Sequence, residues 1–272
     1  MKIDNIPLAE LVNPVCKIAK QAGLEIMRIY EEGFEIEEKQ DSSPLTSADL
    51  ASHRLIIDSL HDLTPNIPIL SEESSAIPYS ERSTWSSYWL VDPLDGTREF
   101  IKRNGEFTVN IALITNQTSS LGVVYIPVQD ICYFASKGHG SFKQEQNKPA
   151  NRIKIRNSTP NNIPTICGSR SHAGESLRAL LTRIGKHELI SMGSSIKMCL
   201  VAEGTADIYP RFGPTSEWDT AAAHCVVEEA GGMLVDTELK PLRYNTKDSL
   251  LNPSFIAIGD LNDAWRKILS CD

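Results

Sequence analysis

The chain has 272 residues, of which 41% are hydrophobic, and it carries a formal net charge of −8. This size and composition allow a sizeable buried core, in one large or two small domains. The negative charge argues against general nucleic-acid binding, which needs clustered Lys and Arg. No apolar run approaches the length that crosses a bilayer, which argues against a transmembrane protein.

The N-terminus and the cysteines indicate a cytoplasmic protein. The first residues lack the basic segment, apolar stretch and small-residue cleavage site of a secretory signal. The six cysteines are scattered, without a Cys-x-x-Cys pair. This spacing argues against a zinc site and a disulfide framework, and it fits a reducing compartment.

Two helices are predicted at the start of the chain. Apolar residues recur at helical spacing over residues 8–30. After a Ser/Pro-containing loop at 40–44, a second helix is predicted from about Ser47. Thr46 and Asp49 have the spacing of a capping box, in which each side chain bonds a backbone N–H of the first turn.

The most informative motif follows a predicted apolar strand at 88–91. It reads Asp92-Pro93-Leu94-Asp95-Gly96-Thr97. The two aspartates and the carbonyl of Leu94 form an oxygen-only ligand set of the kind that Mg²⁺ prefers. The backbone N–H groups of Gly96 and Thr97 can receive a phosphate at the start of the next segment. The motif therefore indicates a metal-assisted phosphate site.

A structural interpretation of the same motif stays open from the residues alone. Asp-Pro and Asp-Gly are ordinary turn signals that need no ligand. An EF-hand is excluded because the alternating ligands and closing Glu of its loop are missing. An aspartic protease is disfavoured because no second Asp-Gly-Thr copy exists to form a dyad.

Two further acidic segments favour the metal site. A predicted strand at 67–70 leads into Glu72 and Glu73, which could instead be a solvated strand end. Asp219 opens an alanine-rich helix at 219–230, where it could instead be a plain N-cap. With the hexapeptide, these segments supply five carboxylates.

The rest of the chain predicts two different sheets. Three β-rich runs with short turns read as an antiparallel sheet; they lie at 107–114, 121–128 and 131–135. From about residue 165, short strands alternate with helices, which indicates a second α/β layer; the helices lie at 176–184, 195–203 and 219–230. An Asn- and Pro-containing stretch at 151–162 is a plausible boundary.

The acidic motifs, in this order, resemble those of the inositol monophosphatase superfamily of Mg²⁺-dependent, lithium-sensitive phosphatases. They are Leu-Ser-Glu-Glu at 70–73, the hexapeptide at 92–97, and Trp-Asp-Thr-Ala-Ala at 218–222. Longer blocks are similar to the bacterial CysQ-type 3'(2'),5'-bisphosphate nucleotidases; they lie at 98–113, 169–172, 193–197, 200–204, 209–215 and 251–253. The resemblance covers nearly the whole chain.

This resemblance implies a mixed α+β and α/β fold, layered as an αβαβα sandwich with two sheets. The site is then expected between two halves. The first half, 1–155, would hold the antiparallel sheet and most metal ligands. The second half, 156–272, would complete the site and bind the nucleoside.

The resemblance also implies a metal ligand set with two or more Mg²⁺ ions. One ion would be held by Glu72, Asp92 and the Leu94 carbonyl, and a second by Asp92, Asp95 and Asp219. Glu72 and Thr97 would act on the attacking water, and Asp49 would hydrogen-bond Thr97. From the residues alone, a cap role for Asp49 is equally well supported. Glu73 would face away from the metal.

Expected substrate contacts come partly from the same residues. The family pattern places the phosphate against Leu94, Asp95, Gly96, Thr97 and Asp219, and the nucleoside against Ser169 and His172. Gly193, Ser194 and Ser195 open a predicted helix whose N–H groups suit an anion. Lys197 adds a positive charge nearby, although from the residues alone a helix N-cap with a surface lysine is the preferred interpretation. Arg211 could meet a distal phosphate or be an ordinary exposed arginine.

The implied activity is removal of the 3'-phosphate from adenosine 3',5'-bisphosphate (PAP), giving AMP and phosphate. The sulfate donor PAPS would be a second substrate, and lithium inhibition is expected. Association with the inner membrane face is a further implication of the resemblance. Two alternatives are an inositol-1-phosphatase or fructose-1,6-bisphosphatase on the same scaffold, and a non-catalytic phospholigand sensor. The oligomeric state is not predicted.

Overall fold

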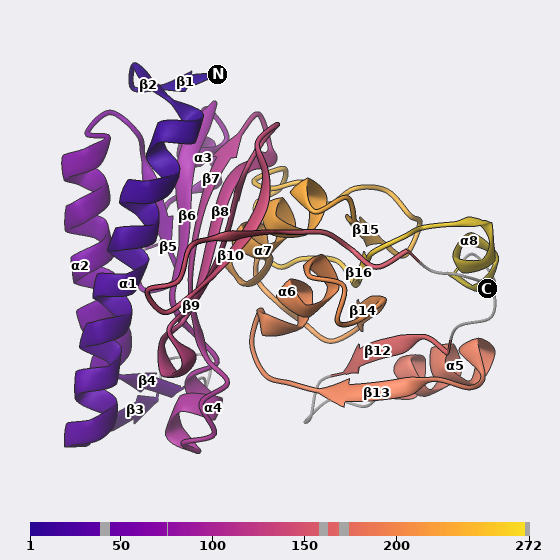
Figure 1. The fold of residues 1–272 in the computed structure, drawn as a ribbon. Coiled ribbons are helices and arrows are strands. Elements are labelled where there is room, and N and C mark those ends of the chain that lie inside the picture. Colours follow the sequence, from indigo (N-terminus) through magenta and orange to yellow (C-terminus); the bar gives the residue numbers. More distant parts are fainter. Residues whose placement is uncertain (39–43, 75, 158–162, 169–173, 270–272) are drawn as a thin grey trace.

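The computed structural model describes residues 1–38, 44–74, 76–157, 163–168 and 174–269. Its elements form five layers, which alternate between helices and sheets (Figure 1). The outer helical layers are α1 (Leu8–Glu32) with α2 (Ser47–Leu63), and α5 (Glu175–Ile184) with α8 (Asp263–Leu269). The middle layer is α6 (Ile196–Ala202) with α7 (Glu217–Glu229). The αβαβα sandwich implied by the resemblance is therefore confirmed.

The first sheet has seven strands in the order β11-β10-β9-β8-β7-β6-β5. Their bounds are β5 (Ile69–Ser71), β6 (Ser87–Asp95), β7 (Thr108–Thr115), β8 (Thr118–Ile126), β9 (Ile131–Ser136), β10 (Gly140–Glu145) and β11 (Asn151–Ile153). Neighbouring strands from β6 to β11 pair antiparallel, which confirms the prediction for β7, β8 and β9, and β5 adds a parallel edge to β6.

Strand β7 shows how both faces of this sheet are buried. Successive strand residues point to opposite faces. Val109 and Ile111 pack in the cluster formed with α1 and α2. Ala112 and Ile114 pack in the cluster that includes α7. A strand covered on both sides can be apolar throughout, which is why this segment lacks a clean polar alternation.

The second sheet has five strands in the order β13-β12-β14-β16-β15. Their bounds are β12 (Thr165–Gly168), β13 (Glu188–Ser191), β14 (Ile208–Arg211), β15 (Met233–Asp236) and β16 (Phe255–Ile258). β12 runs parallel to both β13 and β14, whereas β16 runs antiparallel to both β14 and β15. The second α/β layer expected from residue 165 onward is therefore present.

Short elements complete the fold. They are the paired strands β1 (Lys2–Ile3) and β2 (Ile6–Pro7), the paired strands β3 (Ile36–Glu38) and β4 (Pro44–Thr46), the helices α3 (Tyr79–Arg82) and α4 (Thr97–Ile101), and a 3-10 turn at Pro127–Gln129. In the connection between β5 and β6, Arg82 is buried. Its guanidinium bonds the side chain of Asn245, which anchors the connection to a loop of the other half.

The middle layer joins the two sheets in one core. Leu90 and Ala112 of the first sheet, Val226 of α7, and Tyr209 and Phe255 of the second sheet belong to one cluster of buried side chains. Helix α7 crosses the inner face of β7, β8 and β9. β11 extends the first sheet to Ile153. A division of the chain between 155 and 156 stays a prediction.

Two further observations concern the cysteines and the helices of the described residues. Five cysteines are described, and all are free and buried. None of the described helices is both long and apolar enough to cross a membrane.

We predict that Gly122→Ala destabilises the protein. A Cβ at this position would lie 2.0 Å from the Ala222 carbonyl oxygen, which is backbone of α7 and cannot rotate away. Overpacking a core costs about 1–3 kcal/mol, and each kcal/mol lowers the Tm of a chain this size by roughly 2–4 °C. Thermal melting measures the change. Gly174→Ala is the control, because its Cβ would meet no atom of the described residues within 4 Å. Equal melting of both variants would show that the helix tolerates the displacement.

Candidate active site

A β-bulge aims two carboxylates at one point. In the pairing of β6 with β7, Asp92 lies opposite Asn110 and Asp95 opposite Thr108, with a register shift between them. The three-residue interval from Asp92 to Asp95 on β6 therefore pairs with the two-residue interval from Asn110 to Thr108 on β7. In a regular strand, residues three apart point to opposite faces. The extra residue cancels this difference and places both aspartates on the same face.

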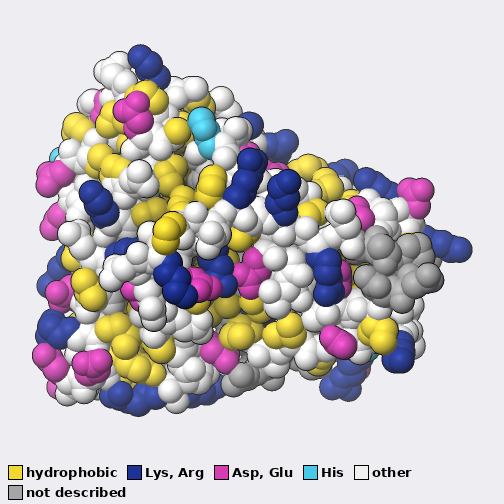
Figure 2. Space-filling model, in the orientation of Figure 1, with side chains coloured by type: hydrophobic (Ala, Val, Ile, Leu, Met, Phe, Trp, Pro, Cys, Tyr) yellow, Lys and Arg dark blue, Asp and Glu magenta, His cyan; other side chains and the backbone are white. Residues whose placement is uncertain are grey.

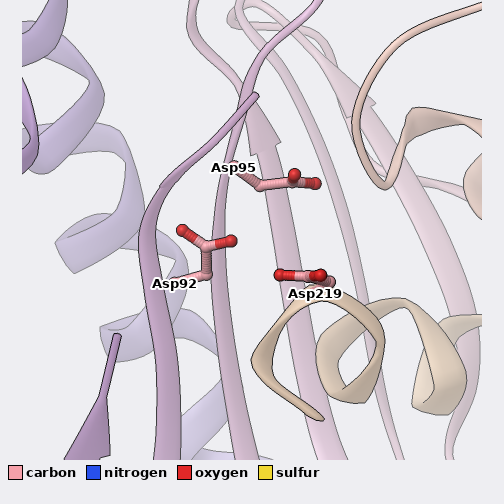
Figure 3. Close-up of side chains that lie close together, drawn as sticks. All are labelled: Asp92, Asp95 and Asp219. Atoms are coloured by element: carbon pink, nitrogen blue, oxygen red, sulfur yellow. The ribbon is translucent and has the colours of Figure 1, made fainter. Parts of the chain in front are cut away.

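The third carboxylate comes from the first turn of α7. Asp219 occupies the third helical position of a capping box whose N-cap is Ser216. Its Oδ2 accepts the Ser216 N–H at 2.8 Å. The alternative of a plain N-cap is therefore wrong in position, because Ser216 is the cap. Asp92, Asp95 and Asp219 each offer an oxygen within 4.8 Å of the others, and Figure 3 shows the three carboxylates turned toward one another.

The electrostatics of this cluster favour a bound cation. Burial and the neighbouring charges of Glu72 and Asp95 hold the pKa of Asp92 well above its usual range. Burial and the charge of Asp95 raise the pKa of Asp219 in the same way. Like charges that are brought together and desolvated disfavour ionisation unless a positive charge is supplied. An all-oxygen donor set fits a hard divalent ion such as Mg²⁺.

Glu72 acts on the cluster through its charge. The Glu72 N–H donates to the Val91 carbonyl at 3.1 Å, which fixes the start of this segment beside β6. Its charge raises the pKa of both Asp92 and Asp219. Within the described chain, however, the 4.8 Å group is the three aspartates. Glu72 lines an adjoining cavity of about 430 Å³ together with Trp218.

Asp49 serves both roles that the sequence left open. Its Oδ2 accepts the Thr46 N–H at 2.7 Å and completes the capping box of α2. Its Oδ1 accepts the Thr97 hydroxyl at 3.2 Å. Thr97 also lies 3.3 Å from the Leu94 carbonyl oxygen. Because Asp49 is 1% exposed, its position is fixed by the core and not by solvent.

Gly96 allows the turn that leads from the aspartates into α4. Its φ of 94° is left-handed, a conformation that other residues rarely adopt. A Cβ at Gly96 would also lie 3.1 Å from the Glu106 carbonyl oxygen. Gly96 therefore lets Thr97 reach the carboxylate of Asp49.

A cleft of about 360 Å³ opens beside the aspartates. Its lining combines three acids with four cations from several elements: Asp95, Glu99, Asp219, Arg98, Lys102, Lys197 and Arg211. On the face of the molecule drawn in Figure 2, acidic and basic side chains of the described residues are interspersed. The four cations of the cleft can attract an anionic ligand of limited size, and the acids beside them can hold a cation.

Lys197 is buried in the cleft wall, so the alternative of a surface lysine is wrong. Its side chain is 5% exposed, and its Nζ donates to the Ser194 carbonyl at 2.5 Å. The ammonium lies 5.1 Å from the Tyr209 ring centroid. Burial lowers the pKa of Lys197 to about 8, against the opposing effect of Asp95.

In the turn before α6 (residues 193–195), backbone N–H groups bind carboxylates of the same chain. The Gly193 N–H donates to Glu106 Oε2 at 2.7 Å, and the Ser195 N–H donates to Asp95 Oδ2 at 2.6 Å. The anion that these N–H groups were expected to suit is therefore, in this structure, a side chain of the first half. The signal that sequence analysis missed was a set of polar residues in an otherwise apolar strand segment, among them Thr108.

The remaining predicted substrate contacts are Arg211, Ser169 and His172. Arg211 lines the cleft, and its Nη2 donates to the Pro214 carbonyl at 3.1 Å, so it is partly anchored and not simply exposed. Ser169 and His172 lie outside the described residues.

Comparison with known proteins places this site in a family. The sequence profile of the inositol monophosphatase family matches residues 8–268. The chain belongs to this family. The Escherichia coli O6:H1 protein named 3'(2'),5'-bisphosphate nucleotidase CysQ is 49% identical over 90% of this chain and 98% of its own length. The Haemophilus influenzae protein of the same name is 38% identical over 95% of this chain and 96% of its own length.

Solved structures agree with this assignment. A crystal structure of CysQ from Bacteroides thetaiotaomicron, described as a bacterial member of the family, has a TM-score of 0.79. It is 42% identical and covers 91% of this chain and 97% of its own. An inositol monophosphatase from Thermotoga maritima has a TM-score of 0.77 at 23% identity, covering 94% of each chain, which supports the fold alone.

We predict that Asp92→Asn raises the Tm of the metal-free protein at neutral pH and abolishes stabilisation by Mg²⁺. Because the pKa of Asp92 is raised in the folded protein, the free energy of unfolding falls as the pH rises through that pKa. The Asn side chain carries no charge and removes this destabilisation. Each kcal/mol of relieved repulsion is worth roughly 2–4 °C. The Asn oxygen can still accept the Leu94 N–H, now 3.1 Å away.

Thermal melting with chelator and with Mg²⁺ provides the measurement, and Asp58→Asn, at an exposed position on α2, is the control. If Asp92→Asn melted below the parent without metal and kept the Mg²⁺ response, Asp92 would be neither a source of repulsion nor a metal ligand.

Proposed function

We propose that this chain is a 3'(2'),5'-bisphosphate nucleotidase that hydrolyses the 3'-phosphate of PAP to give AMP and phosphate, with PAPS as a second substrate. The observation that carries the proposal is the 49% identity to a CysQ nucleotidase over 98% of that protein's length. The acidic cluster beside a cation-lined cleft supports it, because such a site can hold a metal and an anionic substrate together.

The proposed metal site holds two or more Mg²⁺ ions. Glu72, Asp92 and the Leu94 carbonyl would hold one, and Asp92, Asp95 and Asp219 a second. Bound there, the ions would supply positive charge for the phosphoryl oxygens and would favour deprotonation of the attacking water. The convergence of the aspartates supports this ligand set. Lithium inhibition is part of the proposal, by family resemblance.

Thr97 is proposed to orient the attacking water. Its hydroxyl carries one proton, which it can donate to Asp49 Oδ1, an acceptor at 3.2 Å. A hydroxyl that donates to a carboxylate keeps its lone pairs for a proton from elsewhere. Thr97 can therefore accept from a water, and Glu72 is proposed to take that water's other proton. The described site offers no side chain held as a nucleophile by an adjacent base, so attack by water is preferred to a covalent intermediate.

The rest of the substrate is proposed to lie in the cleft. Gly96 and Thr97 would contact the reacting phosphate, beside Leu94, Asp95 and Asp219. Gly193 and Lys197 would contact the remote part of the ligand, and the burial of Lys197 supports a role beyond solubility. Ser169 and His172 are proposed as nucleoside contacts from the family resemblance alone.

The proposal extends to the organisation and place of the protein. We propose that residues 1–155 supply most metal ligands and residues 156–272 the nucleoside site. A cytoplasmic location, with peripheral association to the inner membrane face, follows the family resemblance. Cell fractionation followed by a salt wash of the membranes tests the association. A peripheral protein is released by the salt, whereas a protein that does not bind membranes is found in the aqueous fraction before the wash.

One assay separates the candidate functions. Phosphate release is measured from PAP, PAPS, inositol-1-phosphate and fructose-1,6-bisphosphate, with Mg²⁺ and with chelator, and Asp95→Asn serves as the inactive control. We expect Mg²⁺-dependent release from PAP and PAPS at the highest kcat/KM. A preference for inositol-1-phosphate would make the chain an inositol phosphatase. Tight PAP binding without release from any substrate would make it a sensor.

We predict that Thr97→Ala lowers kcat far more than it raises KM. The hydroxyl acts on the water, whose bonding changes in the transition state, so its loss affects kcat. Proton-handling groups contribute about a hundredfold or more to rate. Saturating rates in excess Mg²⁺ measure the effect, and Thr97→Ser, which keeps the hydroxyl, should recover most of kcat. An unchanged kcat with a raised KM would reduce Thr97 to a phosphate ligand.

We predict that Lys197→Ala raises the KM for PAP about ten- to a hundredfold, the loss expected for one charge-assisted hydrogen bond. A remote contact made equally in the ground and transition states changes KM and leaves kcat alone. A small phosphomonoester without the nucleoside should be hardly affected. Lys186→Ala, at an exposed position, is the control.

The same position gives a pH test. With a pKa of about 8, Lys197 is charged below this value and loses its charge above it. The KM for PAP should therefore rise with pH through about 8 in the parent and stay flatter in Lys197→Ala. Equal losses on PAP and on the small phosphomonoester would instead show that Lys197 serves the reacting phosphate, near Asp95.

A further inference from the structure

The carboxylate of Asp95 is held by one of its two oxygens. Its Oδ2 accepts the Ser194 hydroxyl at 2.8 Å and the Ser195 N–H at 2.6 Å. Two longer contacts, from Thr108 Oγ1 and Asn110 Nδ2, reach the same oxygen at 3.5 Å. In the described part of the chain, every hydrogen bond found for Asp95 ends on Oδ2. Such contacts fix the rotation of the carboxylate and leave Oδ1 for the cluster.

Chemistry fixes the direction of the hydrogen bonds behind this contact. A carboxylate only accepts, so Ser194 must donate its one hydroxyl proton to Asp95. The Asn110 side-chain oxygen likewise accepts, so Ser195 donates to it at 2.9 Å. The Thr108 hydroxyl lies 2.7 Å from Ser194 Oγ and 2.9 Å from Ser195 Oγ. With both serine protons already directed elsewhere, Thr108 is the donor, and its nearest acceptor is Ser194 Oγ at 2.7 Å, ahead of Ser195 Oγ at 2.9 Å and the Asn110 side-chain oxygen at 3.1 Å.

The result is a chain of hydroxyls that runs from the first sheet to the metal cluster. Thr108 donates to Ser194, and Ser194 donates to Asp95, so each bond polarises the next. Thr108 is fully buried, and Asn110 and Ser195 are 1% and 3% exposed, so the part of the network behind the half-buried Ser194 is shielded from water. Ser194 has a φ of 54°, a conformation unusual for serine, which aims its side chain across to the first half.

We propose that Thr108 and Ser194 are positioning residues that set the metal affinity of Asp95 by orienting its carboxylate. This inference rests on the metal role of Asp95 in the proposed function. Groups that hydrogen-bond a metal ligand fix its orientation, and their loss typically lowers metal affinity 10- to 100-fold. The aspartate is supplied by the first half and its orienting serine by the second, so the metal site that includes Asp95 is completed only when the two halves dock.

The test measures metal binding directly, without substrate. Mn²⁺ is titrated into each chelator-treated protein, and the free ion is followed by electron paramagnetic resonance. We expect Thr108→Val to weaken Mn²⁺ binding roughly tenfold. Ser194→Ala should weaken it by a similar factor, and Thr108→Ser, which keeps the hydroxyl, should bind within about twofold of the parent.

Thr115→Val is the matched control. Thr115 lies at the other end of β7 and its hydroxyl is also buried, but it has no hydrogen-bond partner in the described chain. Removing it makes the same chemical change on the same strand without touching Asp95. Its Mn²⁺ affinity should equal that of the parent.

The outcomes separate this inference from the proposed function. If the parent itself bound no Mn²⁺, the proposed metal role would fail. If the parent bound Mn²⁺ and folded Thr108→Val and Ser194→Ala bound it equally well, the positioning role would fail. A loss in Thr115→Val as large as in Thr108→Val would also overturn it, by showing a general effect of β7. Should Thr108→Val not fold, Ser194→Ala, at a partly exposed turn, decides the question alone.

Discussion

Repulsion among desolvated carboxylates is the constraint on which the site depends. The chain places Asp92, Asp95 and Asp219 within 4.8 Å of one another, and the charge of Glu72 adds to their repulsion. Such a group costs stability, because burial and the neighbouring charges raise the pKa values of Asp92 and Asp219. The surrounding core must therefore hold the acids in place, and a cation or a proton must offset their charge. The repulsion raises the free energy of the metal-free folded protein. A bound cation relieves this repulsion and therefore stabilises the fold.

The architecture meets this constraint by taking the acids from rigid elements of different layers. Two come from the bulged end of β6, which is buried between helices on both faces. The third sits in the first turn of α7, where its second oxygen caps the helix. Each carboxylate thus has one oxygen engaged by backbone or hydroxyl donors, and these bonds limit its rotation. In each side chain, one oxygen is held by the protein and the other is left for binding.

Sequence patterns predicted the elements of the fold well, because they are local. The spacing of apolar residues predicted α1, and Thr46 with Asp49 predicted the capping box of α2. The three aspartates were found because they are charged residues at the ends of apolar segments. The partners of Asp95 were missed, since Ser194 lies 99 residues away and only the docking of α6 against β7 brings them together. The burial of Lys197 was missed for the same reason: its neighbour Tyr209 lies on another element.

The turn at 193–195 connects the two tasks that the cleft must perform. Its Ser194 carbonyl accepts the Lys197 ammonium, and its Ser194 hydroxyl donates to Asp95. A single residue in an unusual conformation therefore touches both the cation that would meet the remote part of a ligand and the acid that would hold a metal. A ligand anion that drew the ammonium away would remove one of the bonds that hold this turn. With the proposed roles of Asp95 and Lys197, metal affinity and ligand affinity would be linked through Ser194, and thermodynamic reciprocity would require each to alter the other by the same factor.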